Sequence, residues 1–228
     1  MVPMSNLVFK DAHFQRWKQR VEKNGNTFIN IDVIAAISRD NSSLFGAFLD
    51  CHIMTPEGHE VPRCVLICDD SVVIVPVLYC EENDEIYTMM VEQRRIIDGG
   101  FAVEFPSGGV GRNGDARSMA CQEIKEELHM SIHPEELIPL AVDSIKINPS
   151  FSGDMVDFFY FKKYVSLAFL DDMDGRSTGY HEGFEYIRVR VYKMVDVADH
   201  LTSSALIGIS LLERALNRNF LTKQYLSS

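Results

Sequence analysis

Three carboxylates at a spacing that suits metal binding stand in the segment "SMACQEIKEELHM", from Ser118 to Met130. The small and apolar residues between them predict a helix, on which Glu123, Glu126 and Glu127 share one face within a turn of each other. Like charges at this spacing repel, and hard divalent cations bound among them would offset that repulsion. Taken alone, the pattern fits a metal site or, more commonly, a solvated acidic face.

A glycine-rich stretch directly ahead of this helix favours the metal site. Gly108, Gly109, Gly111 and Gly114 permit positive φ angles and a close approach of the backbone to a ligand. A loop needs both properties if its amide or carbonyl groups are to contact a bound group. We therefore interpret the loop and the helix as one functional segment.

Helices are expected near both ends of the chain. At 13–25, Phe14, Trp17 and Val21 recur at helical spacing ahead of a glycine that ends the helix. From about Ser204, the last helix is expected to place four apolar residues on one face. These residues are Leu206, Ile209, Leu212 and Leu216.

Strands fill most of the chain between these helices. The stretch Leu170–Gly183, rich in Gly and Asp, is expected to be a long functional loop between the last two of them. Alternating or β-branched apolar runs predict the strands themselves. They are expected at 28–37, 44–54 and 61–67, on both sides of the turn at 81–85, and at 138–147, 155–165 and 184–192.

Composition narrows the class of protein. With 46% apolar residues and a formal net charge of −11, the chain is typical of a globular protein without a nucleic-acid surface or an anionic-membrane surface. An anionic substrate would therefore need bridging cations. The chain has no apolar run long enough to cross a membrane and no signal-peptide pattern at its N-terminus, so a cytoplasmic location is expected. The five scattered cysteines are interpreted as reduced thiols.

The segment from Gly108 onward resembles the signature of the Nudix hydrolases. That signature is Gly, five residues, Glu, seven residues, then Arg-Glu-apolar-x-Glu-Glu-x-Gly-apolar. The matching residues are Gly108, Glu123, Ile124, Glu126, Glu127 and Met130. The departures are Gly114 for the first Glu, Gln122 for the Arg and His129 for the last Gly. Asp115 could replace the missing Glu if the loop is one residue short, whereas Gln122 bears on catalytic efficiency.

Further segments resemble the ADP-sugar diphosphatase branch of this family. They are "VEQRR" and "EFPSGG" upstream, then "INPSFSGD", "EGFEYIRVRVY" and "ALIGISLLERAL", and the resemblance covers about residues 28–217. It implies an α/β (α+β) fold, a Nudix α/β/α sandwich around a mixed sheet with a small N-terminal antiparallel β subdomain. We expect the N-terminal helix and subdomain at 1–68, for dimerisation and base recognition, and a catalytic domain at 69–228.

The resemblance also implies roles for single residues. Glu123 and Glu127 become the principal ligands of Mg²⁺ or Mn²⁺, usually more than one ion. Glu126 becomes an auxiliary ligand with a part in catalysis, and the backbone carbonyl of Ser107 a further ligand.

For catalysis and substrate binding, alternatives stay open. The carboxylate that positions or deprotonates the attacking water is Glu185 or Glu182, with strand register favouring Glu185. Arg95 contacts substrate phosphate or forms a structural ion pair with Glu104. Phe28, Phe45 and Phe48 are candidates for stacking on the base, although a place in the core is more common for such rings.

The implied activity is hydrolysis of the diphosphate of a nucleoside-diphosphate sugar, such as ADP-ribose, ADP-glucose or a UDP-sugar, to a nucleoside monophosphate and a sugar phosphate. A homodimer is expected. One alternative is a nucleotide-binding module with weakened turnover, motivated by the three departures. Another is a Nudix enzyme acting on a dinucleoside polyphosphate.

Overall fold

The structure is a computed structural model, and it divides into two compact units. It describes residues 4–38, 44–96, 99–111, 114–179, 186–200, 202–218 and 220. Unit 1 comprises Met1–Ser71, Gly109–Gly114 and Lys146–Val156. Unit 2 comprises Val72–Gly108, Asp115–Ile145 and Asp157–Ser228. The boundary expected between 68 and 69 stays a prediction.

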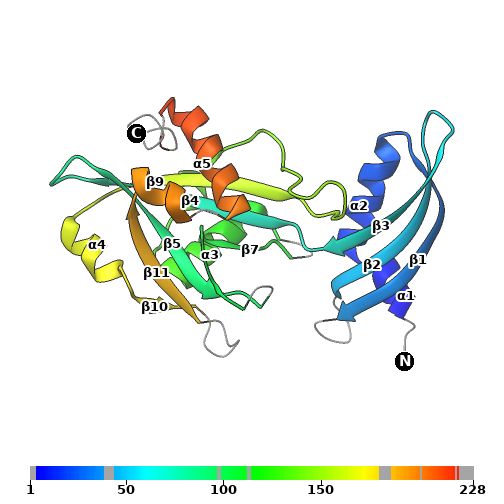
Figure 1. The fold of residues 1–228 in the computed structure, drawn as a ribbon, viewed down its shortest axis with the longest axis horizontal. Coiled ribbons are helices and arrows are strands. Elements are labelled where there is room, and N and C mark those ends of the chain that lie inside the picture. Colours follow the sequence, from blue (N-terminus) through cyan, green and yellow to red (C-terminus); the bar gives the residue numbers. More distant parts are fainter. Residues whose placement is uncertain are drawn as a thin grey trace. The chain divides into compact units, whose positions relative to one another are not determined.

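Unit 1 is built on an antiparallel sheet of order β1-β2-β3 (Figure 1). The strands are β1 (Thr27–Ser38), β2 (Leu44–Met54) and β3 (Glu60–Cys68), close to the expected bounds. The helix expected at 13–25 is α2 (Ala12–Lys23), and a short helix that was not expected, α1 (Met4–Lys10), precedes it. Gly25 follows α2 with a φ of 82°, which a residue with a side chain rarely adopts.

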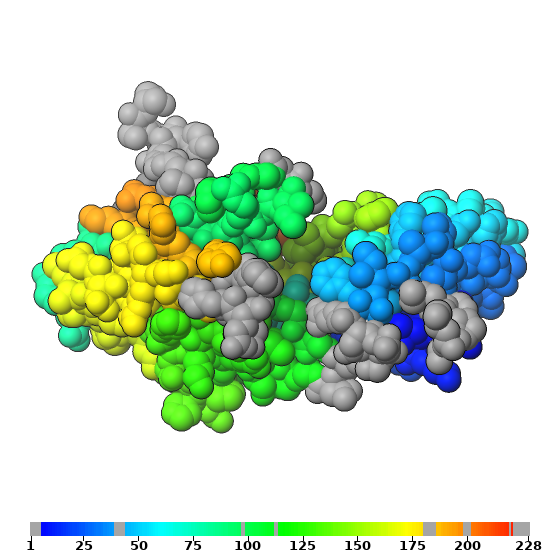
Figure 2. Space-filling view, turned by 90° about the horizontal axis from the view of Figure 1, so that it is seen from below, coloured from blue at the N-terminus to red at the C-terminus, as the bar shows by residue number. Residues whose placement is uncertain are grey.

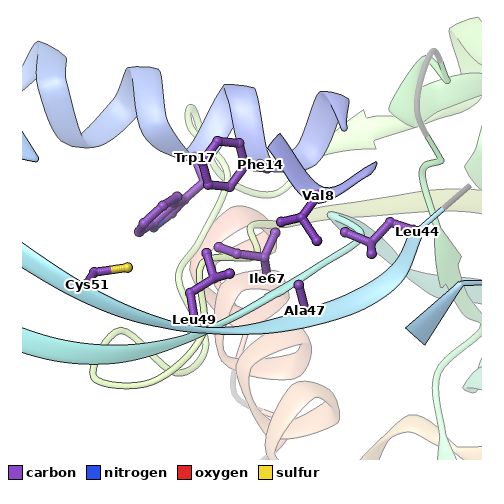
Figure 3. Packing of buried hydrophobic residues seen from close by; sticks show 8 residues of the cluster. All are labelled: Val8, Phe14, Trp17, Leu44, Ala47, Leu49, Cys51 and Ile67. Atoms are coloured by element: carbon purple, nitrogen blue, oxygen red, sulfur yellow. The ribbon is translucent and has the colours of Figure 1, made fainter. Parts of the chain in front are cut away.

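The core of unit 1 lies between these helices and the inner face of the sheet (Figure 3). Trp17 is its largest residue and packs against the rings of Phe14 and Phe28, with centroids 5.8 and 5.2 Å away. Complete burial of one such side chain stabilises a fold by about 1.5–3 kcal/mol. The buried residues are Val8, Phe14, Trp17, Leu44, Ala47, Leu49, Cys51 and Ile67.

Unit 2 is organised around a mixed sheet flanked by helices (Figure 1). Among the described residues the strand order is β10-β11-β5-β4-β9-β8, with β6 paired to β5 and β7 to β4. The strands are β4 (Ser71–Cys80), β5 (Ile86–Arg94), β6 (Phe101–Glu104), β7 (Ser107–Gly109), β8 (Ile138–Pro139), β9 (Val156–Val165), β10 (Ser177–Thr178) and β11 (Ile187–Lys193). The helices are α3 (Ala116–Leu128), α4 (Leu167–Met173) and α5 (Ser203–Leu216), with 3-10 turns η1 (Pro134–Glu136) and η3 (Met194–His200). No helix in the described part of the chain is long and apolar enough to cross a membrane.

Two expectations about unit 2 were wrong in extent. The strand expected at 138–147 is only β8, at the edge of the sheet. Pairing with β9 reaches as far as Leu140, whose N–H donates to the carbonyl of Phe158 (2.8 Å), and Val142 beyond it is fully exposed and buries no apolar surface. The first part of the loop expected at 170–183 belongs to helix α4, whose N-terminal cap is Ser166. A helix of seven residues shows too little periodicity to be found from sequence.

The buried face of α5 also differs from the expected one. Ile209 and Leu212 are buried as expected, but Leu206 is 47% exposed. Ala205 and Gly208 are buried in its place. A Cβ atom on Gly208 would lie 3.2 Å from Val75 and 3.5 Å from Phe105, so the helix packs closely where its residues are smallest.

His13 is a buried titratable group in unit 1. The Arg16 guanidinium can only donate, so the contact between Arg16 and Nδ1 of His13 leaves the ring proton on Nε2. Nε2 lies 2.8 Å from an oxygen of Asp69, a close contact without the alignment of a hydrogen bond. The pKa of His13 is lowered, chiefly because the ring is buried, and Arg16 lowers it further. The carboxylates of Asp69, Asp11 and Asp70 act in the opposite direction but do not outweigh burial.

We expect acidification to destabilise the protein through His13. Because its pKa is lowered by folding, the unfolded chain binds more protons than the folded one below the ordinary value of 6.5. The free energy of unfolding should therefore fall as the pH drops through that value, and His13→Gln should make this fall smaller. Urea denaturation at about pH 7.5 and about pH 5.5 measures the difference.

His52 provides a control of opposite sign. The hydrogen bond from His52 to Glu60 raises the pKa of His52, so its contribution is present at low pH and is lost as the pH rises. His52→Gln should therefore not reduce the loss of stability on acidification. An equal loss in wild type and His13→Gln would show that His13 does not carry the effect.

Candidate active site

Helix α3 carries the predicted metal ligands, and its ends are defined by two residues of the signature segment. Asp115 caps the N-terminus by accepting the Ser118 N–H (3.0 Å). His129 caps the C-terminus in the left-handed conformation, with φ 50° and ψ 29°. The helix thus lies where the sequence predicted it, and the Asp115 side chain serves as its cap.

Glu127 is a carboxylate held inside the protein. Its residue is 3% exposed, and one side-chain oxygen accepts the Ser107 N–H (3.0 Å) from β7. The Glu127 carbonyl accepts the hydroxyl of Thr178 (2.6 Å) from β10. A buried carboxylate is costly unless it is hydrogen-bonded, so these contacts fix both ends of this residue.

Glu123 lies against the glycine strand β7. A Cβ atom on Gly108 would lie 1.8 Å from Oε1 of Glu123 and 2.2 Å from its carboxyl carbon. No side chain fits there without moving Glu123. Glycine is therefore needed at 108 because of this close approach.

Glu126 lies on the exposed side of α3. It accepts a hydrogen bond from Nε2 of Gln122 (2.9 Å), one helical turn earlier. Gln122 stands where the signature has Arg, so a neutral donor makes a contact of the kind expected from a cation. Its hydrogen bond keeps the local geometry but adds no positive charge beside the carboxylates.

The donor atoms of this helix suit a hard cation. Three carboxylates and a nearby backbone carbonyl, that of Ser107, are the oxygen ligands that Mg²⁺ and Mn²⁺ prefer. The close approach of Glu123 to Gly108 and the burial of Glu127 beside Ser107 bring two of the carboxylates to the same strand. Within the described residues, however, no three His, Cys, Asp or Glu side chains already converge as a ligand group.

Gly114 explains why the first glutamate of the signature is absent. A Cβ atom there would lie 1.9 Å from the carbonyl oxygen of Val110. With this loop conformation no side chain, glutamate included, can stand at 114.

Arg95 and Glu104 are paired. Nε of Arg95 donates to Oε2 of Glu104 (2.9 Å), and its Nη2 contacts the same oxygen. Gln93 donates to that oxygen as well (3.2 Å). The Arg95 side chain is 44% exposed and has donors beyond those two, so the pair is compatible with a phosphate contact.

The predicted base-stacking residue is used in packing. Phe28 is half-buried against Trp17, and Phe48 packs on Phe151 with ring centroids 5.8 Å apart. Phe45 is the most exposed of the three candidate rings, at 55%. A role of Phe28 toward a base stays a prediction.

Two of the predicted catalytic residues, Glu182 and Glu185, lie outside the described residues, so their roles also stay predictions. Two buried polar residues that support the site were missed: Gln93 beside Glu104, and Thr178 beside Glu127. Gln93 could have been noticed within "VEQRR". Thr178 stands in no recognisable motif.

Two cavities in the described part of the chain contain none of the predicted site residues. One, of about 300 Å³, lies in unit 2 between Ile86, Met194 and Phe220. The other, of about 230 Å³, lies in unit 1 between Trp17, Arg20 and Lys146.

We expect His129→Gly to stabilise the protein. A left-handed residue with a Cβ atom costs about 1 kcal/mol relative to glycine, so the free energy of unfolding should rise by about 0.5–1 kcal/mol. Lys125→Gly, at an exposed position in the last turn of the same helix, is the control and should lower it by up to about 1 kcal/mol. Urea denaturation measures both variants, and a loss of stability in His129→Gly would mean that the imidazole makes contacts worth more than the strain.

Comparisons with known proteins agree with this architecture. No protein-family model matches the chain. In sequence it is 25% identical over 178 residues to Nudix hydrolase 14, chloroplastic, from Arabidopsis thaliana. The aligned region covers 74% of this chain and 57% of that protein. The chain therefore spans little more than half the length of this relative.

A solved structure is similar in fold. It is described as the crystal structure of ADP compounds hydrolase, and it matches with a TM-score of 0.59 and 13% identity over 84% of this chain and 94% of that chain. This match confirms the expected fold class, a mixed α/β architecture with a small antiparallel sheet. Together with the sequence similarity, it supports the resemblance to the Nudix hydrolases.

Proposed function

We propose that this protein is a divalent-metal-dependent hydrolase of the Nudix superfamily that cleaves the diphosphate of a nucleoside-diphosphate sugar. The substrate is ADP-ribose, ADP-glucose or a UDP-sugar, and the products are a nucleoside monophosphate and a sugar phosphate. The observation that carries the proposal is the contact of α3 with β7. There, the buried carboxylate of Glu127 accepts a hydrogen bond from the Ser107 N–H, and Glu123 fills the space beside Gly108 that a side chain would take.

The proposed metal ligands are Glu123 and Glu127, with Glu126 as an auxiliary ligand and the carbonyl of Ser107 as a further one. Bound Mg²⁺ or Mn²⁺ would supply positive charge to the diphosphate and lower the pKa of a bound water. The acidic chain makes this contribution necessary, because a net charge of −11 would otherwise repel an anionic substrate.

The residues of the chain chiefly hold the reacting parts in place. Ser107 and Thr178 fix Glu127 from two strands, so its carboxylate does not have to be ordered when substrate arrives. Glu104, which also accepts a hydrogen bond from Gln93, orients the guanidinium of Arg95. We propose that this guanidinium contacts the substrate phosphate. Glu185, or in its place Glu182, would accept the proton of the attacking water.

We also propose a homodimer formed through the N-terminal sheet. Strand β1 is an edge strand, and Ile29, Ile34 and Ile37 along it are 51%, 54% and 65% exposed. Residues of β1 and β2 reach the molecular surface, drawn in shades of blue in Figure 2. Exposed apolar groups on an unpaired edge are typical of a surface that a second chain covers.

A second candidate function is a nucleotide-binding module with weakened turnover. It is favoured by Gly114, which leaves no space for the first glutamate of the signature, and by the neutral Gln122 beside Glu126. Incubation of the purified protein with ADP- and UDP-sugars and Mg²⁺ separates the two candidates. Binding without release of AMP or UMP would support the module.

We expect Glu127→Gln to lower kcat by about a hundredfold or more with the fold intact, because the amide can still accept the Ser107 N–H but has lost the charge. Release of AMP or UMP measures kcat, and circular dichroism checks the fold. Glu135→Gln, a change of the same charge at an exposed position of η1, is the control and should leave kcat unchanged. Near-normal turnover of Glu127→Gln would refute its assignment as a metal ligand.

We expect Glu185→Gln to lower kcat more than Glu182→Gln does. Loss of a general base costs about a hundredfold to ten-thousandfold in rate. Turnover of the two variants, measured from a pH of about 6 to about 9, compares them, since only the base should also remove a limb of the pH profile. Equal and mild effects would mean that neither residue is the base.

A further inference from the structure

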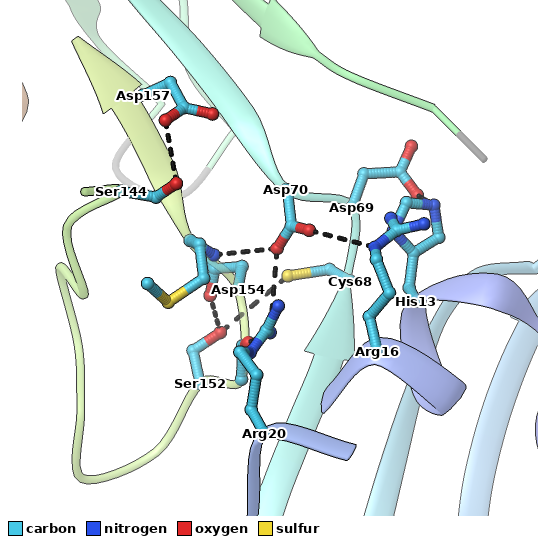
Figure 4. A network of polar contacts seen from close by, with 12 residues as sticks. His13, Arg16, Arg20, Cys68, Asp69, Asp70, Ser144, Ser152, Asp154 and Asp157 are labelled. Carbon is cyan, nitrogen blue, oxygen red and sulfur yellow. Dashed lines mark hydrogen bonds and ion pairs between the residues drawn. The ribbon is translucent and has the colours of Figure 1, made fainter. Parts of the chain in front are cut away.

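Two adjacent carboxylates in unit 1, Asp69 and Asp70, join three segments that are far apart in sequence (Figure 4). They follow the end of β3 and contact α2, Gly109 and Val110 of the glycine loop, and Met155. The resemblance to known enzymes covers about residues 28–217, so no segment of the family corresponds to helix α2. The contacts of this helix with Asp69 and Asp70 point to a role for it.

Asp70 is the centre of these contacts. Its Oδ1 accepts the N–H of Met155 (2.9 Å), and its Oδ2 lies 3.4 Å from Nε of Arg16. A second cation of α2, Arg20, donates from Nη2 to the Gly153 carbonyl (2.6 Å) and places the same atom 3.8 Å from Oδ1 of Asp70. The side chain of Asp70 is only 18% exposed, so these charges interact more strongly than they would on an open surface.

The same two residues hold the start of the glycine loop. The backbone carbonyl of Asp70 accepts the N–H of Val110 (2.8 Å). A Cβ atom on Gly109 would lie 3.3 Å from Oδ2 of Asp69, so the loop backbone runs closely past that carboxylate. Asp69 in turn lies 2.8 Å from the buried ring of His13 on α2.

The chain connects this loop at both ends to the proposed metal-binding residues. Gly108, immediately before it, makes room for Glu123, and Asp115, immediately after it, caps the helix that carries all three glutamates. Because Gly108 and Asp115 are bonded directly to its ends, a displacement of the loop backbone would act on both of them. Its conformation is in turn fixed at Gly109 and Val110 by Asp69 and Asp70.

We propose that Arg16 and Arg20 of α2 are positioning residues that act through Asp70. They hold the Asp70 carboxylate, the Asp70 backbone holds Val110, and the glycine loop is thereby kept in the conformation that the metal-binding residues require. Helix α2 thus supports the glycine loop. The inference rests on the proposed function for its effect on turnover, but not for its effect on the loop.

The experiment compares two double variants of the full-length protein. Arg16→Met with Arg20→Met removes both cations that face Asp70. The matched control, Lys10→Met with Lys23→Met, removes two exposed cations from α1 and α2. The first readout is hydrogen exchange at the Val110 amide relative to the amides of β4 and β9. The second is kcat and KM with the nucleotide sugar and Mg²⁺.

We expect the Val110 amide to exchange at least about tenfold faster in the Arg16/Arg20 variant, with unchanged exchange in the two strands. kcat should fall by about tenfold to a hundredfold, since small displacements in an active site have effects of this size, while KM stays within about twofold. The control should match wild type in both readouts. Arg16→Lys with Arg20→Lys, which keeps both charges, should restore much of the loss.

Unchanged exchange at Val110 would overturn the proposal, and so would an equal rise in exchange throughout the protein, which would mean that the arginines act on global stability alone. If the Arg16/Arg20 variant does not fold, Asp70→Asn gives the same test, because its amide oxygen can still accept the Met155 N–H. If wild type hydrolyses no nucleotide sugar, the proposed function fails. The exchange measurement then still decides whether α2 supports the loop.

Discussion

The contact of the Glu127 carboxylate with the Ser107 N–H is the constraint on which the candidate site depends. Glu127 is only 3% exposed, and a buried carboxylate needs hydrogen-bond donors. One of its donors is the Ser107 N–H of β7. The contact fixes the distance and the rotation of α3 relative to the glycine strand. Glu123 then lies on the same side of the helix, against Gly108, because it is four residues away. The position of one buried charge thus decides where the other acidic groups of the helix lie.

Glycine is required at 108 and at 114 for two different reasons. At 108 a side chain of another residue, Glu123, occupies the space, so the requirement follows from a functional group. At 114 the backbone carbonyl of Val110 occupies it, so the requirement follows from the shape of the loop alone. A loop that turns this tightly has no place for the glutamate that the family signature has there. The remaining carboxylate of the loop, Asp115, is used to start α3.

The elements that were predicted correctly are those whose signals lie within one short segment of sequence. The strands of unit 1 and helices α2 and α3 were found because their apolar period, caps and turns are complete within the segment. Helix α4 was not, since seven residues carry too little period, and the strand that begins at Ile138 was expected to be longer than β8 is. The acidic ligand set was predicted from its spacing and stays a prediction. The role of Asp70 could not be found, because its partners stand 54 and 85 positions away and nothing near it in sequence points to them.

The positions of the cations determine how much of the negative charge on α3 is compensated by the protein itself. At 122, where the signature has arginine, glutamine keeps the hydrogen bond to Glu126 but does nothing to offset the charge of its neighbours. Arg95 pairs with Glu104 and Arg16 with Asp70, and neither of these acidic partners lies on α3. In the proposed function, bound cations neutralise the helix, so metal affinity would depend strongly on the conformation of the glycine loop and on the contacts that hold it.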